Sequence, residues 1–279
     1  MTVRIVTDST CDLPSEIIKR YDIRVVPLYI NVGNKGYLDG VDMTRDEFYT
    51  KLPTFPTHPT TAVPSGQKFH AVYDALAEEG ASEIISIHIS EALSAVVNVA
   101  RMAAQETTSA IVTALDSRQL SLGTGFLVET AAKMAAVGGS VAEILSALEN
   151  QIKRSHVFAA LDTLEFLRRS GRMNRFMANM GSLLQIKPIM VMHDGIPSSE
   201  RVRTRERALQ RVIEMLRNVG EIERIAIVHT HVAERVKELR AQAGSLLPAG
   251  DILVEDITPV IGAHIGPGAA GFAVVTAQA

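Results

Sequence analysis

Residues 3–21, VRIVTDSTCDLPSEIIKRY, join a short β-branched run to a segment whose apolar residues recur at helical spacing. The run predicts a strand that ends in turn residues, and Pro14 stands early in the segment, where a helix tolerates proline. A strand followed at once by a helix is the unit from which parallel sheets are built.

The same unit recurs through the first half of the chain, which predicts a Rossmann-like parallel sheet with right-handed crossovers. Pro27 demotes the second strand to an edge or bulged position. A longer helical region is broken at Gly138 and Gly139. The further strands are expected at 24–32, 83–90 and 109–117, and the helices at 13–21, 44–52, 65–80, 91–106 and 119–153.

The pattern changes near Ser155, so we predict two α/β domains, 1–154 and 155–279. Asp162 and Glu165 have the spacing of a capping box, and Gly171 stands where a helix ends in glycine. Asp194 and Gly195 predict a hairpin turn. The other elements of this half are strands at 156–162, 224–230, 252–257 and 271–275 and helices at 203–218 and 232–244.

The composition excludes several classes of protein. Of 279 residues, 47% are hydrophobic and 21% charged, with a formal net charge of −3 and 5% aromatics. This balance argues against nucleic acid or an anionic membrane as the main partner. The lone cysteine, Cys11, forms no internal disulfide, and no leader or bilayer-length apolar run is visible. We expect a cytoplasmic protein.

Ligand-binding residues are expected where strands end and helices begin. In TDSTCD, residues 7–12, an aspartyl nucleophile would need a second carboxylate where Thr10 stands. We therefore interpret Asp8, Ser9 and Asp12 as binding backbone amides at a turn.

Two further stretches supply hydroxyl groups. In TTAVPSG, residues 60–66, Ser65 suits a helix N-cap, which leaves the hydroxyl of Thr61 freer to face a ligand. Ser94 is expected in the first turns of the helix that follows Ser90. No histidine or carboxylate stands at a diagnostic spacing from Ser94, so we do not interpret it as a nucleophile.

The stretch GAHIGPGAAG, residues 262–271, surrounds His264 with small residues. One interpretation makes Gly266 a cap and Pro267 the first residue of a helix, so that the amides of Gly268, Ala269 and Ala270 form an anion site. The other interpretation is close packing of a helix on a sheet. The stretch lacks the lysine of a P-loop.

Arg172 follows the glycine that ends the predicted helix, a position that often only complements the helix dipole. Methionines cluster around it, which suits either the wall of a pocket for a long apolar ligand or an irregular core. His229 and His231 have no carboxylate or thiolate beside them in the sequence, so we expect no metal. The methionines are Met173, Met177, Met180, Met190 and Met192.

Five stretches in order resemble the signatures of DegV-family fatty-acid-binding proteins. They are VTDSTCDLP, DTLEFLRRSGRM, LLQIKPIM, VRTRERAL and ITPVIGAHIGPGAAG. The resemblance implies a two-domain α/β protein without catalysis or a cofactor of its own. Such a protein buries a long-chain fatty acid such as palmitate near its domain interface and presents the carboxylate to a separate kinase subunit.

Residue by residue, the resemblance implies that Thr61, Ser94, Arg172 and His264 contact the carboxylate. The loop residues Gly266, Gly268 and Ala269 would support this anion site. The chain departs from the family pattern where Ala62, Val63, Ala95, Val96 and Asn98 replace more polar or smaller residues. These changes make the rim of the site more apolar.

The resemblance also implies that arginines in the run SSERVRTRER dock the kinase, and we assign this role to Arg203 and Arg205. A solvated charged face is the other interpretation of the run. Two other functions stay open: a stand-alone phosphotransferase that binds phosphate at the glycine loop, and a regulatory protein that senses lipid.

Overall fold

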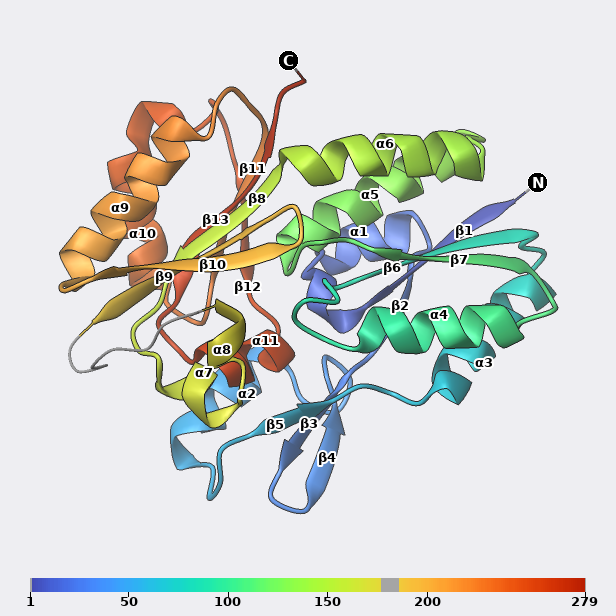
Figure 1. The fold of residues 1–279 in the computed structure, drawn as a ribbon, viewed down its shortest axis with the longest axis horizontal. Coiled ribbons are helices and arrows are strands. Elements are labelled where there is room, and N and C mark those ends of the chain that lie inside the picture. Colours follow the sequence, from blue (N-terminus) through green and yellow to red (C-terminus); the bar gives the residue numbers. More distant parts are fainter. Residues whose placement is uncertain (1, 177–185, 279) are drawn as a thin grey trace.

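The computed structural model describes residues 2–176 and 186–278, which form two α/β domains (Figure 1). The first sheet has the strand order β2-β1-β6-β7 and is parallel throughout, as the strand–helix repeat predicts. Its strands are β1 (Val3–Asp8), β2 (Arg24–Val26), β6 (Glu83–His88) and β7 (Ile111–Asp116).

Helices cover both faces of this sheet, with α5 and α6 on one side and α3 and α4 on the other (Figure 1). The helical region expected at 119–153 divides where Gly139 donates its amide to the Met134 carbonyl at 2.9 Å. Ser140 and Glu143 then form a capping box that begins α6. The helices are α1 (Ser15–Arg20), α3 (Gly66–Glu78), α4 (Val96–Glu106), α5 (Leu122–Ala136) and α6 (Val141–Arg154).

The second sheet is mixed, with the order β10-β9-β8-β13-β11-β12, and only β11 and β12 pair in parallel. The predicted hairpin turn lies at Asp194 and Gly195, between β9 and β10. The strands are β8 (Ser155–Ala160), β9 (Lys187–His193), β10 (Ile196–Val202), β11 (Ile222–His229), β12 (Leu253–Asp256) and β13 (Ala270–Thr276).

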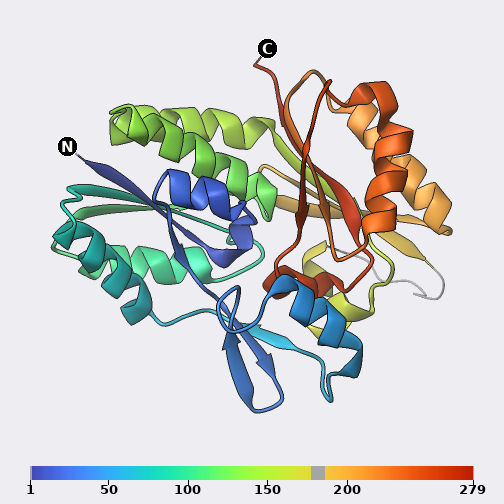
Figure 2. The same cartoon turned by 180° about the vertical axis from the view of Figure 1, so that it is seen from behind.

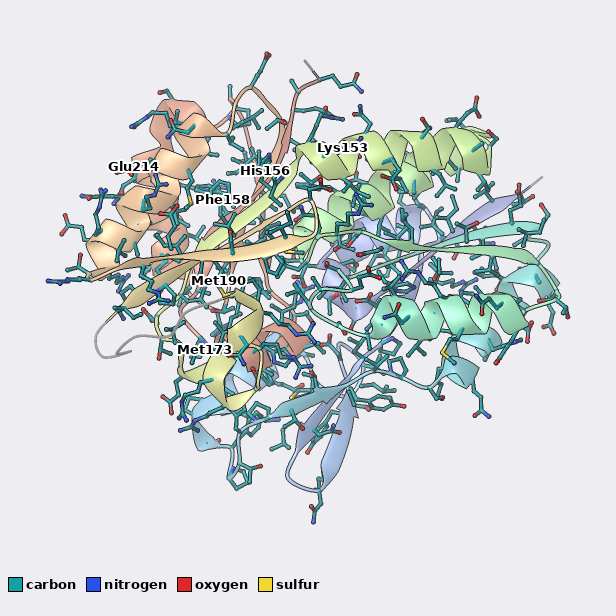
Figure 3. The ribbon with its side chains drawn as sticks, in the orientation of Figure 1. Lys153, His156, Phe158, Met173, Met190 and Glu214 are labelled. Carbon is teal, nitrogen blue, oxygen red and sulfur yellow. The ribbon has the colours of Figure 1, made fainter. Side chains whose placement is uncertain are left out.

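The two faces of this sheet belong to different cores. Phe158 and Phe272 pack with α9 (Arg205–Asn218) and α10 (Ala233–Ala243), whereas Met190 on β9 joins the core that extends into the first domain. Met190 and Met173 of α8 lie on the side of the sheet away from Glu214 of α9 (Figure 3). One apolar layer therefore continues between the domains.

The single strand expected at 24–32 is wrong. Pro27 lacks an N–H group, and the chain leaves the parallel sheet there. It continues as β3 in a separate antiparallel sheet of order β4-β3-β5, seen at the base of the molecule in Figure 2. The elements of this region are β3 (Tyr29–Val32), β4 (Lys35–Leu38), α2 (Arg45–Lys51) and β5 (Thr60–Ala62).

Short elements complete the fold and connect the domains. These are η1 (Ser9–Cys11), η2 (Leu52–Thr54), α7 (Glu165–Arg169), α8 (Met173–Phe176), η3 (Gly244–Leu246) and α11 (Pro259–Ile265). No helix among residues 2–176 and 186–278 is both long and apolar enough to cross a bilayer.

Candidate functional site

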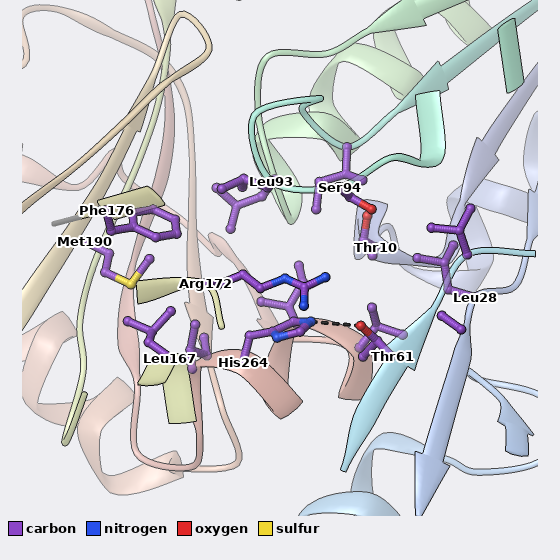
Figure 4. Close-up of a pocket in the computed structure, with 17 residues that line it drawn as sticks. Thr10, Leu28, Thr61, Leu93, Ser94, Leu167, Arg172, Phe176, Met190 and His264 are labelled. Carbon is purple, nitrogen blue, oxygen red and sulfur yellow. Dashed lines mark hydrogen bonds between the residues drawn. The ribbon is translucent and has the colours of Figure 1, made fainter. Parts of the chain in front are cut away.

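A pocket of about 640 Å³, partly open to solvent, lies between the domains. Figure 4 shows polar side chains in its middle, with Leu28 on one side and Phe176 and Met190 on the other. The first domain contributes Thr10, Leu28, Thr61, Ala62, Val63, Ile89, Leu93, Ser94 and Leu120, and the second contributes Leu167, Arg172, Phe176, Met190, Val260, Ile261, His264 and Ile265.

The four residues expected to contact a carboxylate, Thr61, Ser94, Arg172 and His264, all line this pocket. β5 supplies Thr61 and α11 supplies His264, and the Thr61 Oγ1 lies 2.9 Å from the His264 Nε2. The two side chains form a hydrogen bond across the domain interface.

His264 is neutral in this environment. Burial, together with the charges of Arg172 and His58, lowers the pKa of its imidazole to about 3. The His264 Nδ1 is buried without a hydrogen-bond partner among the described residues. A neutral imidazole carries one N–H. Nε2 takes part in the hydrogen bond with Thr61, and Nδ1 is the nitrogen without a partner.

Arg172 brings a cation into the pocket. Gly171, with φ of +71°, ends α7 as predicted, and the next residue turns inward. Its guanidinium donates to the Ser170 carbonyl at 2.9 Å and forms no ion pair with any carboxylate of the described residues. Burial lowers the pKa of Arg172, with Arg175 adding to the effect, yet an arginine stays protonated. An unpaired cation in an apolar pocket favours an anionic ligand.

Ser94 faces the pocket, although its predicted place in a helix is wrong. α4 begins two residues later, at Val96, and Ser94 lies in the turn before it, where its amide donates to the Ser90 carbonyl at 3.1 Å. No group of the described residues binds its hydroxyl, which stays available to a ligand.

The anion site expected at Gly266, Gly268 and Ala269 is wrong. No helix begins at Pro267, because α11 ends at Ile265 and β13 begins at Ala270. The amide of Gly266 donates to Gly262, and those of Gly268 and Ala269 donate to the Thr230 carbonyl and hydroxyl at 3.2 and 2.7 Å. These amides are occupied.

Close packing explains the glycine at 266. Its φ of +75° is a left-handed conformation, and a β-carbon there would collide with the Phe166 ring. The glycine after α11 is therefore required by the backbone conformation and by the contact with Phe166. His264 is the polar residue of this stretch that lines the pocket.

Two further details of the second domain differ from expectation. Asp162 is not an N-cap: α7 begins at Glu165, and the Asp162 carboxylate instead pairs with Lys187 and Arg235. Of the clustered methionines, Met190 lines the pocket and Met192 a second cavity. Met177 and Met180 lie outside the described residues.

The second cavity, which is also partly open to solvent, has an almost purely hydrocarbon lining. It lies against the inner face of the second sheet and shares five lining residues with the pocket, namely Leu120, Phe176, Met190, Ile261 and Ile265. Its other lining residues are Ser121, Val157, Ala159, Leu161, Val191, Met192, Val228 and Ile257. The polar pocket and this apolar cavity are therefore neighbours that share part of their lining.

A buried network supports the pocket wall at Thr10. The Asp8 carboxylate accepts the Thr10 amide at 3.0 Å, as the turn interpretation predicts, and also a bond from His88 Nδ1 at 2.9 Å. Ser86 connects His88 to Tyr73. Burial acts to raise the pKa of Asp8, but the His88 and Thr10 contacts together lower it. Residues this far apart in sequence offered no local signal of the network.

No group of three or more histidine, cysteine or acidic residues that could hold a metal occurs among the described residues. His229 and His231 both contact the Asp256 carboxylate, at 3.1 and 3.3 Å. These contacts give the two histidines a role in the fold near the domain interface.

Comparisons with known proteins agree with this arrangement. A family model described as "Uncharacterised protein, DegV family" matches residues 2–277. A DegV domain-containing protein of Caldanaerobacter subterraneus is 34% identical over 273 residues, which cover 96% of this chain and 97% of the relative. One of Mycobacterium tuberculosis is 34% identical over 280 residues, which cover 98% and 97%.

Solved structures match over the same extent. A DegV family protein from Thermus thermophilus, described as fatty acid binding, has a TM-score of 0.90 at 35% identity, covering 99% of this chain and 100% of its own. DegV of Bacillus subtilis, a fatty acid binding protein, has a TM-score of 0.90 at 27% identity with the same coverage. A stearic acid-binding protein of Eubacterium ventriosum has a TM-score of 0.84 at 26% identity, covering 98% of both chains.

Proposed function

This chain belongs to the DegV family, and from that premise we propose that it binds a long-chain fatty acid, such as palmitate, in the pocket between its domains. We place the domain boundary between residues 154 and 155, where α6 ends and β8 begins. The observation that carries the proposal is the cation of Arg172, which has no carboxylate partner among the described residues and faces a pocket whose other lining residues are mostly apolar.

The head-group site would consist of Arg172, Thr61, Ser94 and His264. An unpaired carboxylate in a protein interior costs several kcal/mol, so a buried fatty acid needs donors and a cation around its oxygens. The guanidinium supplies the charge and the free hydroxyl of Ser94 a hydrogen bond. The Thr61–His264 pair supplies a further donor.

The acyl chain would occupy the second cavity. Palmitate has roughly fifteen methylene and methyl groups, each worth about 0.8 kcal/mol on burial, or about 12 kcal/mol before the costs of association. Leu120, Phe176 and Ile265 line both cavities, and an acyl chain would pass between them from the polar pocket into this hydrocarbon space. Replacement of polar rim residues by Ala62 and Val63 extends the apolar surface at the pocket mouth.

We further propose that the protein acts in the cytoplasm as a carrier without catalysis of its own, presenting the carboxylate to a separate kinase subunit. Arg203 and Arg205 would form part of the docking surface. Arg203 lines a concave surface with Arg168 and Lys187, and Arg205 is half-exposed with Glu238 as its ion-pair partner at 3.1 Å. Replacing both with alanine should weaken kinase binding and its salt dependence, and unchanged binding would exclude this surface.

The alternative of a phosphotransferase at the glycine loop loses its basis, because the amides of that loop already donate within the protein. Native mass spectrometry of protein purified without detergent, before and after organic extraction, tests the carrier function. The expected result is an adduct with the mass of a long-chain fatty acid that extraction removes. An apo mass in repeated preparations, with no uptake of added palmitate, would contradict the proposal.

A further inference from the structure

Asp12 connects three segments of the protein from a fully buried position. It follows η1 with φ of +54°, a left-handed conformation that aspartate tolerates better than most residues. Its Oδ1 accepts the Thr258 amide at 2.9 Å and Arg45 Nη2 at 3.2 Å, and its Oδ2 accepts the Ser121 hydroxyl at 2.5 Å. One carboxylate thus holds residues from both domains.

Two of these segments carry residues that line both cavities and would border the proposed passage between them. Ser121 follows Leu120, and Thr258 immediately precedes α11, which carries Ile261 and Ile265. Leu120, Ile261 and Ile265 are three of the five residues common to both cavities. Asp12 therefore bonds to the segments that carry these shared lining residues, while it lines neither cavity itself.

The segment that carries Asp12 is closely packed against its neighbours. A β-carbon on Gly125 of α5 would collide with the Cys11 carbonyl, so the helix packs directly against the segment that carries Asp12. Arg45 extends the network to Glu255 of β12 at 3.0 Å. The carboxylate is fixed from both sides.

α11 has a second attachment that does not involve Asp12. The Tyr49 hydroxyl donates to the Ile257 carbonyl at 2.8 Å, and the Thr258 hydroxyl donates to Asp39. Loss of the Asp12 side chain would leave α11 attached, and Ser121 would keep its backbone bonds to α5 but lose its side-chain bond to the Asp12 segment. The expected consequence is a changed passage within a folded protein.

We propose that Asp12 is a positioning residue for the acyl chain, which holds the passage between the polar pocket and the hydrocarbon cavity open to long chains. The inference rests on the proposed fatty-acid binding. It predicts that Asp12 affects the part of the ligand beyond the passage and leaves the head group unaffected.

The test compares wild type with Asp12→Gly and Asp12→Asn in binding decanoate, laurate, myristate and palmitate. Glycine removes the three bonds while tolerating the left-handed backbone, and asparagine can accept from Thr258 and donate to Ser121. In Asp12→Gly we expect decanoate affinity within about twofold of wild type and palmitate affinity at least about tenfold lower. Asp12→Asn should restore the rise of affinity with chain length.

Glu129→Gln is the matched control, since Glu129 also joins the domains, through Arg224, but lines neither cavity. It should leave the chain-length profile unchanged. Equal losses at every chain length in Asp12→Gly, or no loss at all, would overturn the inference. If wild type binds none of the four acids, the proposed function itself fails, and the two failures are thereby distinguished.

Discussion

Thr61 and His264 are 203 positions apart in the chain, yet Thr61 Oγ1 and His264 Nε2 lie 2.9 Å apart. β5 belongs to the small sheet of the first domain and α11 to the second domain, so this hydrogen bond exists only when the domains are joined. Arg172 and Ser94 enter the same pocket from α7–α8 and from the turn before α4 (Figure 4). The proposed head-group site thus depends on the contact between the domains.

His264 should remain neutral throughout the physiological range. Its pKa, about 3 because of burial and the nearby Arg172 and His58, lies below the ordinary value of 6.5. A histidine with a lowered folded pKa costs stability as the pH falls from 6.5 towards 3. NMR of the ligand-free protein should show no titration of the His264 ring between pH 5 and 8, and a midpoint above 6 would contradict this environment.

Arg172→Met should reduce palmitate affinity by about 100-fold, because the buried carboxylate loses its counter-charge. Hexadecanol, which has the same chain and no charge, should bind the variant about as well as wild type. Arg168→Met is the control, because it removes an equal charge from the exposed side of α7. Equal losses for acid and alcohol would mean that Arg172 acts through packing.

Met192→Ala should enlarge the second cavity. We expect a loss of about 2–5 kcal/mol in the free energy of unfolding and a shift of preference from palmitate towards longer acids. Met173→Ala provides the comparison, since Met173 is buried but lines neither cavity. Chemical denaturation and competition binding measure the two effects. An unchanged preference in Met192→Ala would place the acyl chain elsewhere.

Asp12 should make the folded protein more stable at lower pH, which is the opposite of the usual effect of an aspartate. Burial raises the pKa of its carboxyl to about 7, although Arg45, Ser121 and Thr258 act to lower it. The folded protein then binds a proton more readily than the unfolded chain, so stability is gained as the pH falls from about 7 towards 4. Asp12→Asn cannot titrate, and the stability of wild type relative to this variant should fall as the pH rises through that window.

Urea unfolding of both proteins at pH 5.5, 6.5 and 7.5 measures this difference. Asp39, whose pKa burial raises to about 6, contributes equally to both proteins if Asp12→Asn leaves its contacts intact. A constant difference between the two proteins across this range would show that Asp12 does not titrate there.

Much of the fold followed from local pattern. The repeated β-branched run and amphipathic helix predicted the parallel sheet, and Gly171 predicted the end of α7. Two predictions from local pattern were wrong. The strand expected around Pro27 divides between two sheets, and Gly266 is small because the Phe166 ring packs against it, not because a helix begins there. Both failures arise because spacing does not reveal what the chain meets in space.

The residues of the candidate site were identified through their resemblance to a family, and the structure brings Thr61, Ser94, Arg172 and His264 into one pocket. The contacts of Asp8 could be predicted from the sequence in part, whereas those of Asp12 could not. Asp8 binds its own turn, as its sequence predicts, but its bond to His88 joins neighbouring strands. The contacts of Asp12 reach positions 121 and 258, which no local pattern relates to it.

The sequence by itself determined the two α/β domains, because strand and helix periodicity are local properties, and its resemblance to a family indicated the residues of the candidate site. Tertiary structure decided that the amides of the glycine loop are occupied, that the Arg172 cation lacks a carboxylate among the described residues, and that the pocket and the second cavity share lining residues. These depend on distances between distant segments, since burial and hydrogen bonding are set by the closure of one domain on the other.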